Sequence, residues 1–393
     1  MAGTANATKD RAAAGATRED FLARARALVP TLRDRAATTE AARCVPAETV
    51  AAFKSAGLLH MTQPARYGGA EMGWDVLCEA ARTLAVGDGA QAWIQAIMAD
   101  HAAMLGTFPV EAQDEVWGTD PGAVLSASFD PVGVATPAAG GFRYAGRHSF
   151  ASGVDHADWL ICGGFIVDGD KKNGPHFFLV PRSEATIIDD WDTVGLEGTG
   201  SKSFEVEDVF VPAHRRLDGA LARAGNAAGT AVNKAPVYRL PRGGLSPTIF
   251  GALTVGMAQG LLAEWLDYTK GRSSHGLSVA GDPGSQFVAG QASAEIAAAD
   301  ALNLFTAREG MRTLAAGKAM TPAEILLAKR NAAYAANLAL GAGLRLINAA
   351  GGRAIFRASP LQRCYRNLLA SASHFSITWD RAAIAAGASL LGK

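Results

Sequence analysis

Two histidines and one serine–glycine pair are the residues in this sequence best suited to proton chemistry. His101 and His374 can each gain or lose a proton near neutral pH, because an unperturbed imidazole has a pKa of about 6.5. Ser152 supplies a hydroxyl that donates or accepts a hydrogen bond, and Gly153 lets the backbone turn sharply or approach a planar group. A site of this kind would take a proton from a small molecule held beside a flat ring.

Each of these residues also has a purely structural interpretation. His101 could cap the helix that we expect to end near Leu105, and His374 could lie at the interface of an oligomer. Ser152 could be an ordinary turn serine at the corner of a hairpin. The catalytic interpretation therefore depends on what the rest of the chain places beside these residues.

The elements around Ser152 are predicted to be strands. Residues 147–164 are rich in aromatic and β-branched side chains on both sides of the serine–glycine pair, which indicates strand, sharp turn and strand. Ser126 and Ser128 lie two residues apart in another predicted strand, so both point to one face of it. In isolation both are ordinary strand residues. Trp93 could line the same site, although burial in the core is the more common role of tryptophan.

The composition excludes several classes of protein. The 393 residues include 37 Lys and Arg and 37 Asp and Glu, so the charge pattern favours neither nucleic acid nor an acidic membrane surface as partner. No apolar run reaches the roughly 18 residues of a transmembrane helix. We expect residues 1–17, which are small and polar, to be a disordered tail. Four widely spaced cysteines favour a reduced, cytoplasmic protein.

The sequence lacks the common nucleotide and metal motifs. No Gly-x-Gly-x-x-Gly turn and no Walker loop follows a predicted strand, so we expect no pyridine-nucleotide or ATP site of those types. We predict no metal site, because five further histidines lack partners at the spacing of metal ligands: His148, His156, His176, His214 and His275.

The hydrophobic period changes twice along the chain and predicts three regions. Residues 18–120 follow helical spacing, as do residues 243–393, where a stripe of alanines would permit the close packing of a four-helix bundle. Residues 121–217 contain short apolar runs punctuated by Gly and Pro, which predicts a small antiparallel barrel or sandwich. Residues 218–242 are predicted to form a loop. We therefore expect a mostly α-helical chain with a central small β-barrel.

This order of regions resembles the acyl-CoA dehydrogenase fold. Residues 146–163 are similar to that family's strand-turn-strand beside the flavin ring. Residues 195–212 contain a glycine turn followed by Glu-Asp-Val-Phe-Val-Pro, which resembles the family's next strand. Gly351 and Gly352, followed by residues 363–367, resemble the segment that closes the bundle over the flavin.

One departure favours a particular branch of this fold. Many acyl-CoA dehydrogenases carry a catalytic carboxylate in a Tyr-Glu-Gly motif, whereas residues 368–377 contain no acid and place His374 there. The pattern resembles the oxygenase components of two-component flavin monooxygenases, such as the hydroxyphenylacetate, steroid-ring phenol and dibenzothiophene enzymes. The resemblance implies a reduced flavin (FMNH2 or FADH2) supplied by a separate NAD(P)H-dependent reductase. It also implies O2, a flavin C4a-hydroperoxide, and transfer of one oxygen atom to an aromatic, phenolic, indolic or polyketide-type substrate.

The resemblance also implies roles for individual residues. Ser152 matches the serine that contacts flavin N5, while His101 and His374 match two histidines on the substrate side. One of Ser126 and Ser128 would lie near the substrate, and both are also expected beside the cofactor, but the register is not fixed by the sequence. The remaining expected contacts are on the cofactor, from Gly153, Arg272, Gly351 and Gly352, and on the substrate, from Trp93. Arg272 would bind the flavin phosphate through its guanidinium, although a solvated or ion-paired arginine is more common.

Two other functions stay open from the sequence. One is an acyl-CoA dehydrogenase with tightly bound FAD and a base from elsewhere in the chain. The other is a non-catalytic scaffold that kept the fold. The fold itself implies a homo-oligomer, expected to be a homotetramer.

Overall fold

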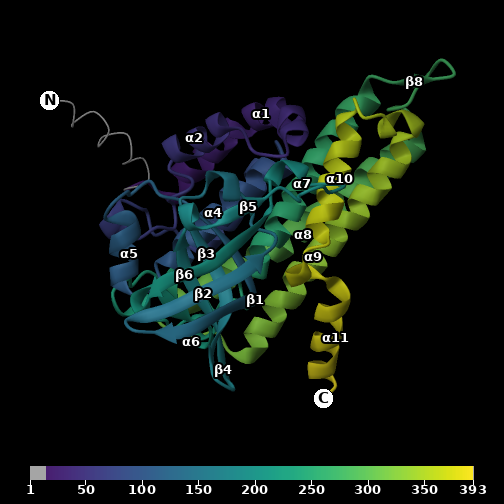
Figure 1. Cartoon of the computed structure of the whole chain (residues 1–393). Coiled ribbons are helices and arrows are strands. Elements are labelled where there is room, and N and C mark those ends of the chain that lie inside the picture. The colour runs from purple at the N-terminus through teal and green to yellow at the C-terminus, as the bar shows by residue number, and fades with distance from the viewer. Residues whose placement is uncertain (1–14, 393) are drawn as a thin grey trace.

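The computed structural model describes residues 15–392, in which helices, then strands, then helices follow one another (Figure 1). The predicted disordered tail falls mostly on residues 1–14, which lie outside the described residues. Thr17 belongs to the structured part, because its side chain accepts a hydrogen bond from the backbone of Asp20 and begins the first helix with a capping box. The helices of the N-terminal part are α1 (Arg18–Ala42), α2 (Ala47–Ser55), α3 (Trp74–Ala85), α4 (Gly89–Leu105) and α5 (Val110–Trp117).

Helix α4 is the central helix of this part. Asp88 caps it by accepting a hydrogen bond from the backbone of Gln91 at 2.9 Å. Every residue from Gly89 to Leu105 is buried, as the sequence predicts from a segment that is apolar on nearly all sides. The helix contacts the sheet through β1 and the C-terminal bundle through α7 and α10. Side chains on α4 can therefore reach both of the other regions.

The central region is one seven-stranded sheet in the order β5-β6-β2-β1-β3-β4-β7. Strands β1 and β3 pair in parallel, with Ser126 opposite Leu160, and the remaining pairs are antiparallel. The strands are β1 (Leu125–Ala138), β2 (Gly141–His148), β3 (Trp159–Asp168), β4 (Lys171–Pro181), β5 (Thr186–Ile188), β6 (Ser203–Pro212) and β7 (Arg216–Asp218).

The predicted barrel is not closed. Among the described residues the two edge strands, β5 and β7, pair only with β6 and β4 and not with each other. Both edge strands are three residues long, which is too short to complete a ring of hydrogen bonds. The region is thus an open sheet. The segment expected to be a loop, 218–242, contains a short helix, α6 (Gly219–Ala224), and two short 3-10 helices.

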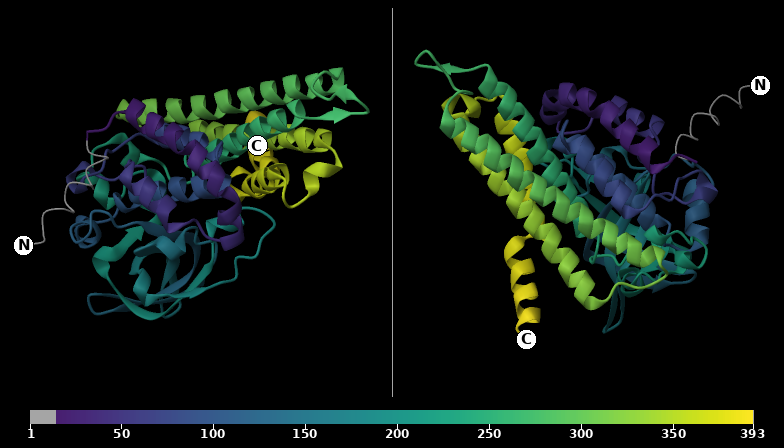
Figure 2. Two further views of the ribbon diagram at one scale, coloured as in Figure 1. Left: turned by 90° about the horizontal axis from the view of Figure 1, so that it is seen from above. Right: turned by 180° about the vertical axis from the view of Figure 1, so that it is seen from behind.

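Long helices form the C-terminal bundle (Figure 2). Three of them begin with the same signature, in which Asp282, Thr321 or Ser359 accepts a hydrogen bond from the first turn and a proline follows directly. The helices are α7 (Pro247–Lys270), α8 (Pro283–Ala315), α9 (Pro322–Ala350), α10 (Pro360–Ala372) and the C-terminal α11 (Trp379–Leu390). A two-stranded hairpin, β8 (Ser273–Ser274) with β9 (Leu277–Ser278), projects from the bundle end away from the sheet (Figure 1).

Small residues let these helices approach closely. The predicted alanine stripe on α9 is buried at all four positions, Ala328, Ala332, Ala335 and Ala339. Helix α7 is long and apolar enough to cross a membrane by length and composition, and 67% of its most apolar window is buried. Because α7 contacts α3, α8, α9 and α10, packing in the core accounts for its apolar character.

Candidate active site

One face of α4 carries two of the predicted site residues. Trp93 and His101 are eight positions apart with Ile97 midway between them, so all three side chains lie on the same face. Trp93 and Ile97 retain 7% of their exposed surface and His101 retains 2%. The face lies where α4 meets β1 on one side and α7 on the other. A single buried helix therefore positions both residues.

The Ser152 hydroxyl lies in a network of buried hydrogen bonds. Trp93 donates its indole N–H to Ser152 Oγ at 3.1 Å. Ser152 Oγ lies 2.7 Å from Ser201 Oγ, which in turn lies 2.7 Å from Thr199 Oγ1. The Thr199 hydroxyl donates to the carbonyl of Leu196 at 2.8 Å. The glycine-containing loop after β5 thus holds the serine from one side while α4 holds it from the other.

Ser126 and Ser128 hold the backbone of the same turn. The hydroxyl of Ser126 donates to the Ser152 carbonyl at 2.9 Å, and that of Ser128 donates to the Ser149 carbonyl at 2.8 Å. Both side chains are buried and point to one face of β1. Ser126 is fully enclosed, whereas Ser128 keeps a little exposed surface, so Ser128 has the better access to a bound molecule.

The backbone on either side of Ser152 is in the left-handed region. Gly153 has a φ of 71°, and a Cβ there would lie 2.8 Å from Cε of Met98, so glycine is needed at this position. Phe150 has a φ of 60° and leaves 73% of its side chain exposed. A strained, exposed aromatic residue beside the serine is a candidate for contact with a planar ring. The sequence pattern does not single out Phe150, because its hydrophobic spacing alone predicts a strand residue.

His101 is held in one tautomer. Its Nδ1 lies 2.9 Å from the carbonyl of Leu125, and a carbonyl only accepts, so Nδ1 carries the proton. Burial lowers the pKa of His101, an effect that the adjacent Asp100 carboxylate and the bond to Leu125 partly oppose. The neutral ring therefore presents Nε2 as a proton acceptor. Phe129 packs edge-on against this ring, with centroids 5.5 Å apart.

His374 is held in the opposite tautomer. Its Nδ1 accepts a hydrogen bond from the backbone N–H of Ser376 at 3.3 Å, so the neutral ring carries its proton on Nε2. Burial lowers the pKa of His374 to about 4. The ring stacks on Phe250 at 3.8 Å between centroids and lies 5.7 Å from the Trp93 ring. The structure thus brings Trp93, Ser152 and His374 into one connected set.

Comparison with known proteins decides the family. Residues 16–119 match the model of the acyl-CoA dehydrogenase N-terminal domain, and residues 248–379 match that of the C-terminal domain. The oxygenase subunit HsaA, a flavin-dependent monooxygenase from Mycobacterium tuberculosis, is 35% identical over 364 residues, covering 92% of each chain. The chain belongs to the family of flavin-dependent monooxygenase oxygenase subunits.

Further relatives of this monooxygenase support the same family assignment. The oxygenase component of an FADH2-dependent resorcinol hydroxylase from Rhizobium is 32% identical and aligns over 92% of this chain and 91% of its own. The crystal structure of M. tuberculosis HsaA matches with a TM-score of 0.91 and 34% identity, covering 96% of this chain and 98% of that one. XiaF from Streptomyces, in complex with FADH2 and glycerol, matches with a TM-score of 0.90 and 26% identity over 96% of each chain. The predicted fold family, the flavin cofactor and the monooxygenase class are confirmed.

The monooxygenase chain does not bring all predicted cofactor residues together. Arg272 donates to the carbonyl of Ala350 at 2.8 Å, where α9 ends, and Gly351 with a φ of 76° follows directly. These residues and Gly352 lie where α7 meets the β8–β9 hairpin, at the end of the bundle away from the sheet (Figure 1). Within one chain they form a group separate from Ser152 and the two histidines.

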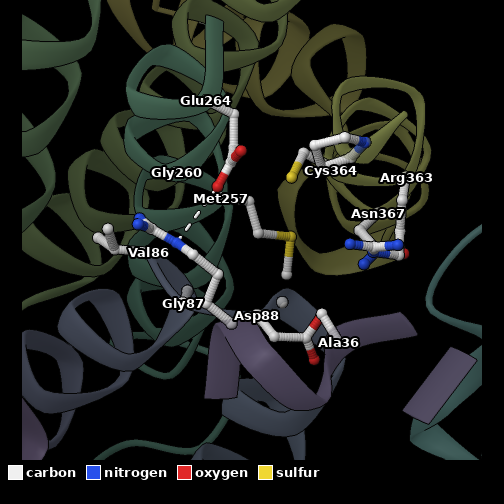
Figure 3. A pocket seen from close by; sticks show the side chains of 14 residues that line it. Ala36, Val86, Gly87, Asp88, Met257, Gly260, Glu264, Arg363, Cys364 and Asn367 are labelled. Atoms are coloured by element: carbon white, nitrogen blue, oxygen red, sulfur yellow. Dashed lines mark ion pairs between the residues drawn. The ribbon is translucent and has the colours of Figure 1, made fainter. Parts of the chain in front are cut away.

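A hollow of about 220 Å³ lies at the N-terminal end of α4 (Figure 3). Asp88, Glu264, Arg363 and Cys364 line it, and Arg33 forms an ion pair with Glu264 at 3.2 Å. Burial raises the pKa of Asp88 to about 6, although the hydrogen bonds from Gln91 oppose this. Neither histidine of the site and none of the three serines around the turn lines this hollow.

The residues around Ser152 fit a bound flavin ring. Ser152 keeps some exposed surface, and Phe150 projects beside it on a strained backbone. At the neighbouring Gly153 a Cβ would meet Met98 and Ile94 of α4, so the glycine lets this turn pack closely against the helix. Among the described residues no cluster of His, Cys, Asp and Glu could hold a metal ion.

Proposed function

We propose that this oxygenase subunit hydroxylates a phenol or a related aromatic molecule between His101 and His374. The observation that carries the proposal is the opposite tautomers of the two neutral histidines. Nε2 of His101 can accept the proton of a phenolic hydroxyl. Nε2 of His374 can donate a hydrogen bond to the phenolic oxygen both before and after that proton leaves. The named activities of the relatives support an aromatic substrate, since they include hydroxylases of resorcinol and p-hydroxyphenylacetate.

His101 is the proposed general base. Its Nε2 can accept the phenolic proton, which makes the ring electron-rich and so more reactive toward an electrophilic oxygen. The Leu125 carbonyl stabilises the imidazolium that forms, because the proton on Nδ1 stays hydrogen-bonded. His374 donates from Nε2 and orients the same substrate, while its stack on Phe250 keeps the ring in place.

Ser152 is the proposed contact to the flavin ring at N5, with Gly153 and Phe150 beside the ring. When bound, reduced flavin activates O2 and supplies the oxygen atom that is transferred. The chain's own contribution is to hold the ring against Ser152 and to exclude water. Trp93 and Ser201, which contact the Ser152 hydroxyl, are buried, and so are Ser126 and Ser128, which hold the backbone of the same turn.

We further propose that a second copy of the chain supplies Arg272, Gly351 and Gly352 to each flavin site. In support, several large apolar side chains on α8, on α11, in the turn just before α11 and near these glycines are exposed in the single chain, namely Phe287, Phe305, Ile355, Phe356, Phe375 and Ile384. A homotetramer would cover such surfaces. Co-expression of Arg272→Ala and Ser152→Ala chains tests this idea, because shared sites would regain activity that neither variant has alone. Hybrids as inactive as both parents would show that Arg272 serves only its own chain.

We also propose that a separate NAD(P)H-dependent reductase supplies the reduced flavin. The sequence has no dinucleotide fingerprint, and the open sheet has a single parallel pair, so no nicotinamide platform of the common type is present in residues 15–392. Equal numbers of acidic and basic residues favour transfer of free reduced flavin over docking by charge. The free thiols of all four cysteines support a cytoplasmic location.

Anaerobic titration with reduced FMN and reduced FAD, followed by mixing with oxygen and a panel of phenols, tests the function. We expect tight binding of at least one reduced flavin and one hydroxylated product. A protein that purifies with bound FAD and oxidises acyl-CoA would contradict the proposal.

A further inference from the structure

Three hydroxyl groups form a row behind the proposed flavin contact. The row runs from Ser152 Oγ to Ser201 Oγ, then to Thr199 Oγ1, and ends at the carbonyl oxygen of Leu196. Its three oxygen–oxygen distances are 2.7, 2.7 and 2.8 Å. All three side chains are buried, so bulk water does not compete for these bonds.

The direction of this row follows from counting protons. Two oxygens this close require a hydrogen between them, and the three gaps need three hydrogens. The Leu196 carbonyl has none to give, so each hydroxyl must donate its single proton to the next oxygen toward Leu196. At the other end, the Trp93 indole can only donate, and it donates to Ser152 Oγ. Every proton in the row therefore points away from Trp93.

Ser152 is consequently an acceptor toward any bound molecule. Its proton is committed to Ser201, one lone pair takes the Trp93 N–H, and one lone pair remains free. Reduced flavin carries a hydrogen on N5 and can donate to this lone pair. Oxidised flavin has only a lone pair at N5, which would face another lone pair and gain no hydrogen bond.

We propose that Ser201 and Thr199 are positioning residues that make Ser152 select reduced over oxidised flavin. This inference rests on the proposed function, because it assumes that flavin N5 meets Ser152. The two residues need not touch the flavin themselves. They act by fixing the direction of the Ser152 hydroxyl, and this selection would favour the form that a separate reductase delivers.

The backbone at the end of the row is held firmly. Leu196 has a left-handed φ of 56°, which is costly for a residue with a branched side chain. Its N–H donates to Asn367 Oδ1 at 2.8 Å, and its carbonyl also accepts from the Trp191 indole at 3.1 Å. Gly153 N–H donates to the Thr199 carbonyl at 3.2 Å. These bonds keep the terminal acceptor in line with the hydroxyls.

The direction of the row can be measured without flavin, from the indole N–H resonance of Trp93 in protein labelled at tryptophan. Donation by Ser152 to Ser201 strengthens Ser152 as an acceptor. Ser201→Ala should therefore weaken the Trp93 bond and move the indole proton upfield. If Ser201 donated to Ser152 instead, the same variant would remove a competitor and move that proton downfield. An unmoved or downfield resonance overturns the proposal.

Matched variants then test redox selection through binding of reduced and oxidised flavin. Ser201→Ala frees the Ser152 proton, so the preference for reduced flavin should fall by about fivefold, the effect of one neutral hydrogen bond. Thr199→Val should act in the same direction, whereas Thr199→Ser keeps the hydroxyl and should retain the parent preference. Ser203→Ala is the control, because this buried serine donates to Ser149 outside the row.

The outcomes separate this inference from the proposed function. An unchanged binding preference in Ser201→Ala, with tight binding of reduced flavin by the parent, overturns redox selection alone. If the parent binds neither flavin form, the proposed function fails and redox selection fails with it. A loss of preference in Ser203→Ala equal to that in Ser201→Ala would show a general effect on folding and would also overturn the proposal.

Discussion

The indole of Trp93 donates a hydrogen bond to the hydroxyl of Ser152 at 3.1 Å. Both groups are buried, and they come from α4 and from the turn between β2 and β3, which are far apart in sequence. The same indole lies 5.7 Å from the ring of His374. One side chain thus connects the proposed flavin contact to the proposed substrate contact, and its removal should disturb both.

The first prediction concerns Trp93→Phe. This variant keeps an aromatic ring against Phe250 but removes the donor to Ser152, so hydroxylation should become less well coupled to flavin consumption. Loss of one hydrogen bond of about 1 kcal/mol predicts a several-fold rise in hydrogen peroxide released per reduced flavin. Peroxide and product are measured in the same single-turnover reaction. Trp379→Phe on α11 is the control and should behave as the parent. Equal coupling in the parent, Trp93→Phe and Trp379→Phe would show that Trp93 plays no part in the site.

The second prediction concerns His101→Gln. Glutamine cannot take a proton, so hydroxylation should fall on the order of a hundredfold or more, as for loss of a general base. Consumption of reduced flavin and O2 should continue, with peroxide as the product. Rapid chemical quenching measures product per turnover. Hydroxylation at the parent rate would show that His101 is structural.

The third prediction concerns pH. Burial lowers the pKa of both histidines, that of His374 to about 4, so both rings are neutral at neutral pH and gain a proton only below the ordinary pKa of 6.5. The rate of hydroxylation at saturating substrate should therefore decline on acidification with a midpoint below pH 6.5. A histidine with an ordinary pKa would instead produce a rise centred near pH 6.5. Observing that rise, and its absence in His101→Gln, would contradict the lowered pKa of His101.

The fourth prediction concerns Asp88 at the start of α4. Its folded pKa of about 6 exceeds the ordinary 3.8, so the folded chain binds this proton more tightly than the unfolded chain. The carboxyl's contribution to stability should fall as pH rises from about 4 to 6 and then remain low. Asp88→Asn can still cap the helix and has no proton to lose, so its advantage over the parent should grow across that range, by up to about 3 kcal/mol.

Thermal unfolding of the parent and Asp88→Asn at several pH values provides the measurement. A constant difference between the two proteins from pH 4 to 7 would contradict the raised pKa. Glu324→Gln is the control for loss of a carboxyl near a helix start, because Glu324 lies on the surface in the first turn of α9.

The sequence was sufficient to place those site residues whose position depends only on their spacing along one helix or strand. The eight-residue interval between Trp93 and His101 fixes them on one face of α4, and the two-residue interval between Ser126 and Ser128 fixes both on one face of β1. The glycine at position 153 likewise indicates a turn. The family resemblance then assigned Ser152 to the flavin, which stays a prediction.

Contacts between distant segments could not be predicted in this way. Ser201 and Thr199 look like ordinary loop residues until the fold brings them behind Ser152. Phe150 was missed because the hydrophobic pattern around it predicts an extended strand, whereas its backbone is left-handed. The prediction of a closed barrel was wrong because edge strands as short as β5 and β7 give no periodic sequence signal. Without that signal, an open sheet cannot be distinguished from a closed one.

The central claim is that this chain inserts oxygen from O2 into an aromatic substrate by using reduced flavin made elsewhere. The most direct test places the chain and a phenolic substrate on one side of a dialysis membrane and a flavin reductase with NADH on the other. Reduced flavin crosses anaerobically, and heavy-isotope O2 is then admitted. Our account predicts a hydroxylated product on the chain's side that carries one heavy oxygen atom. A product without the label, or NADH oxidation by this chain at the rate of turnover with no reductase present, would contradict it.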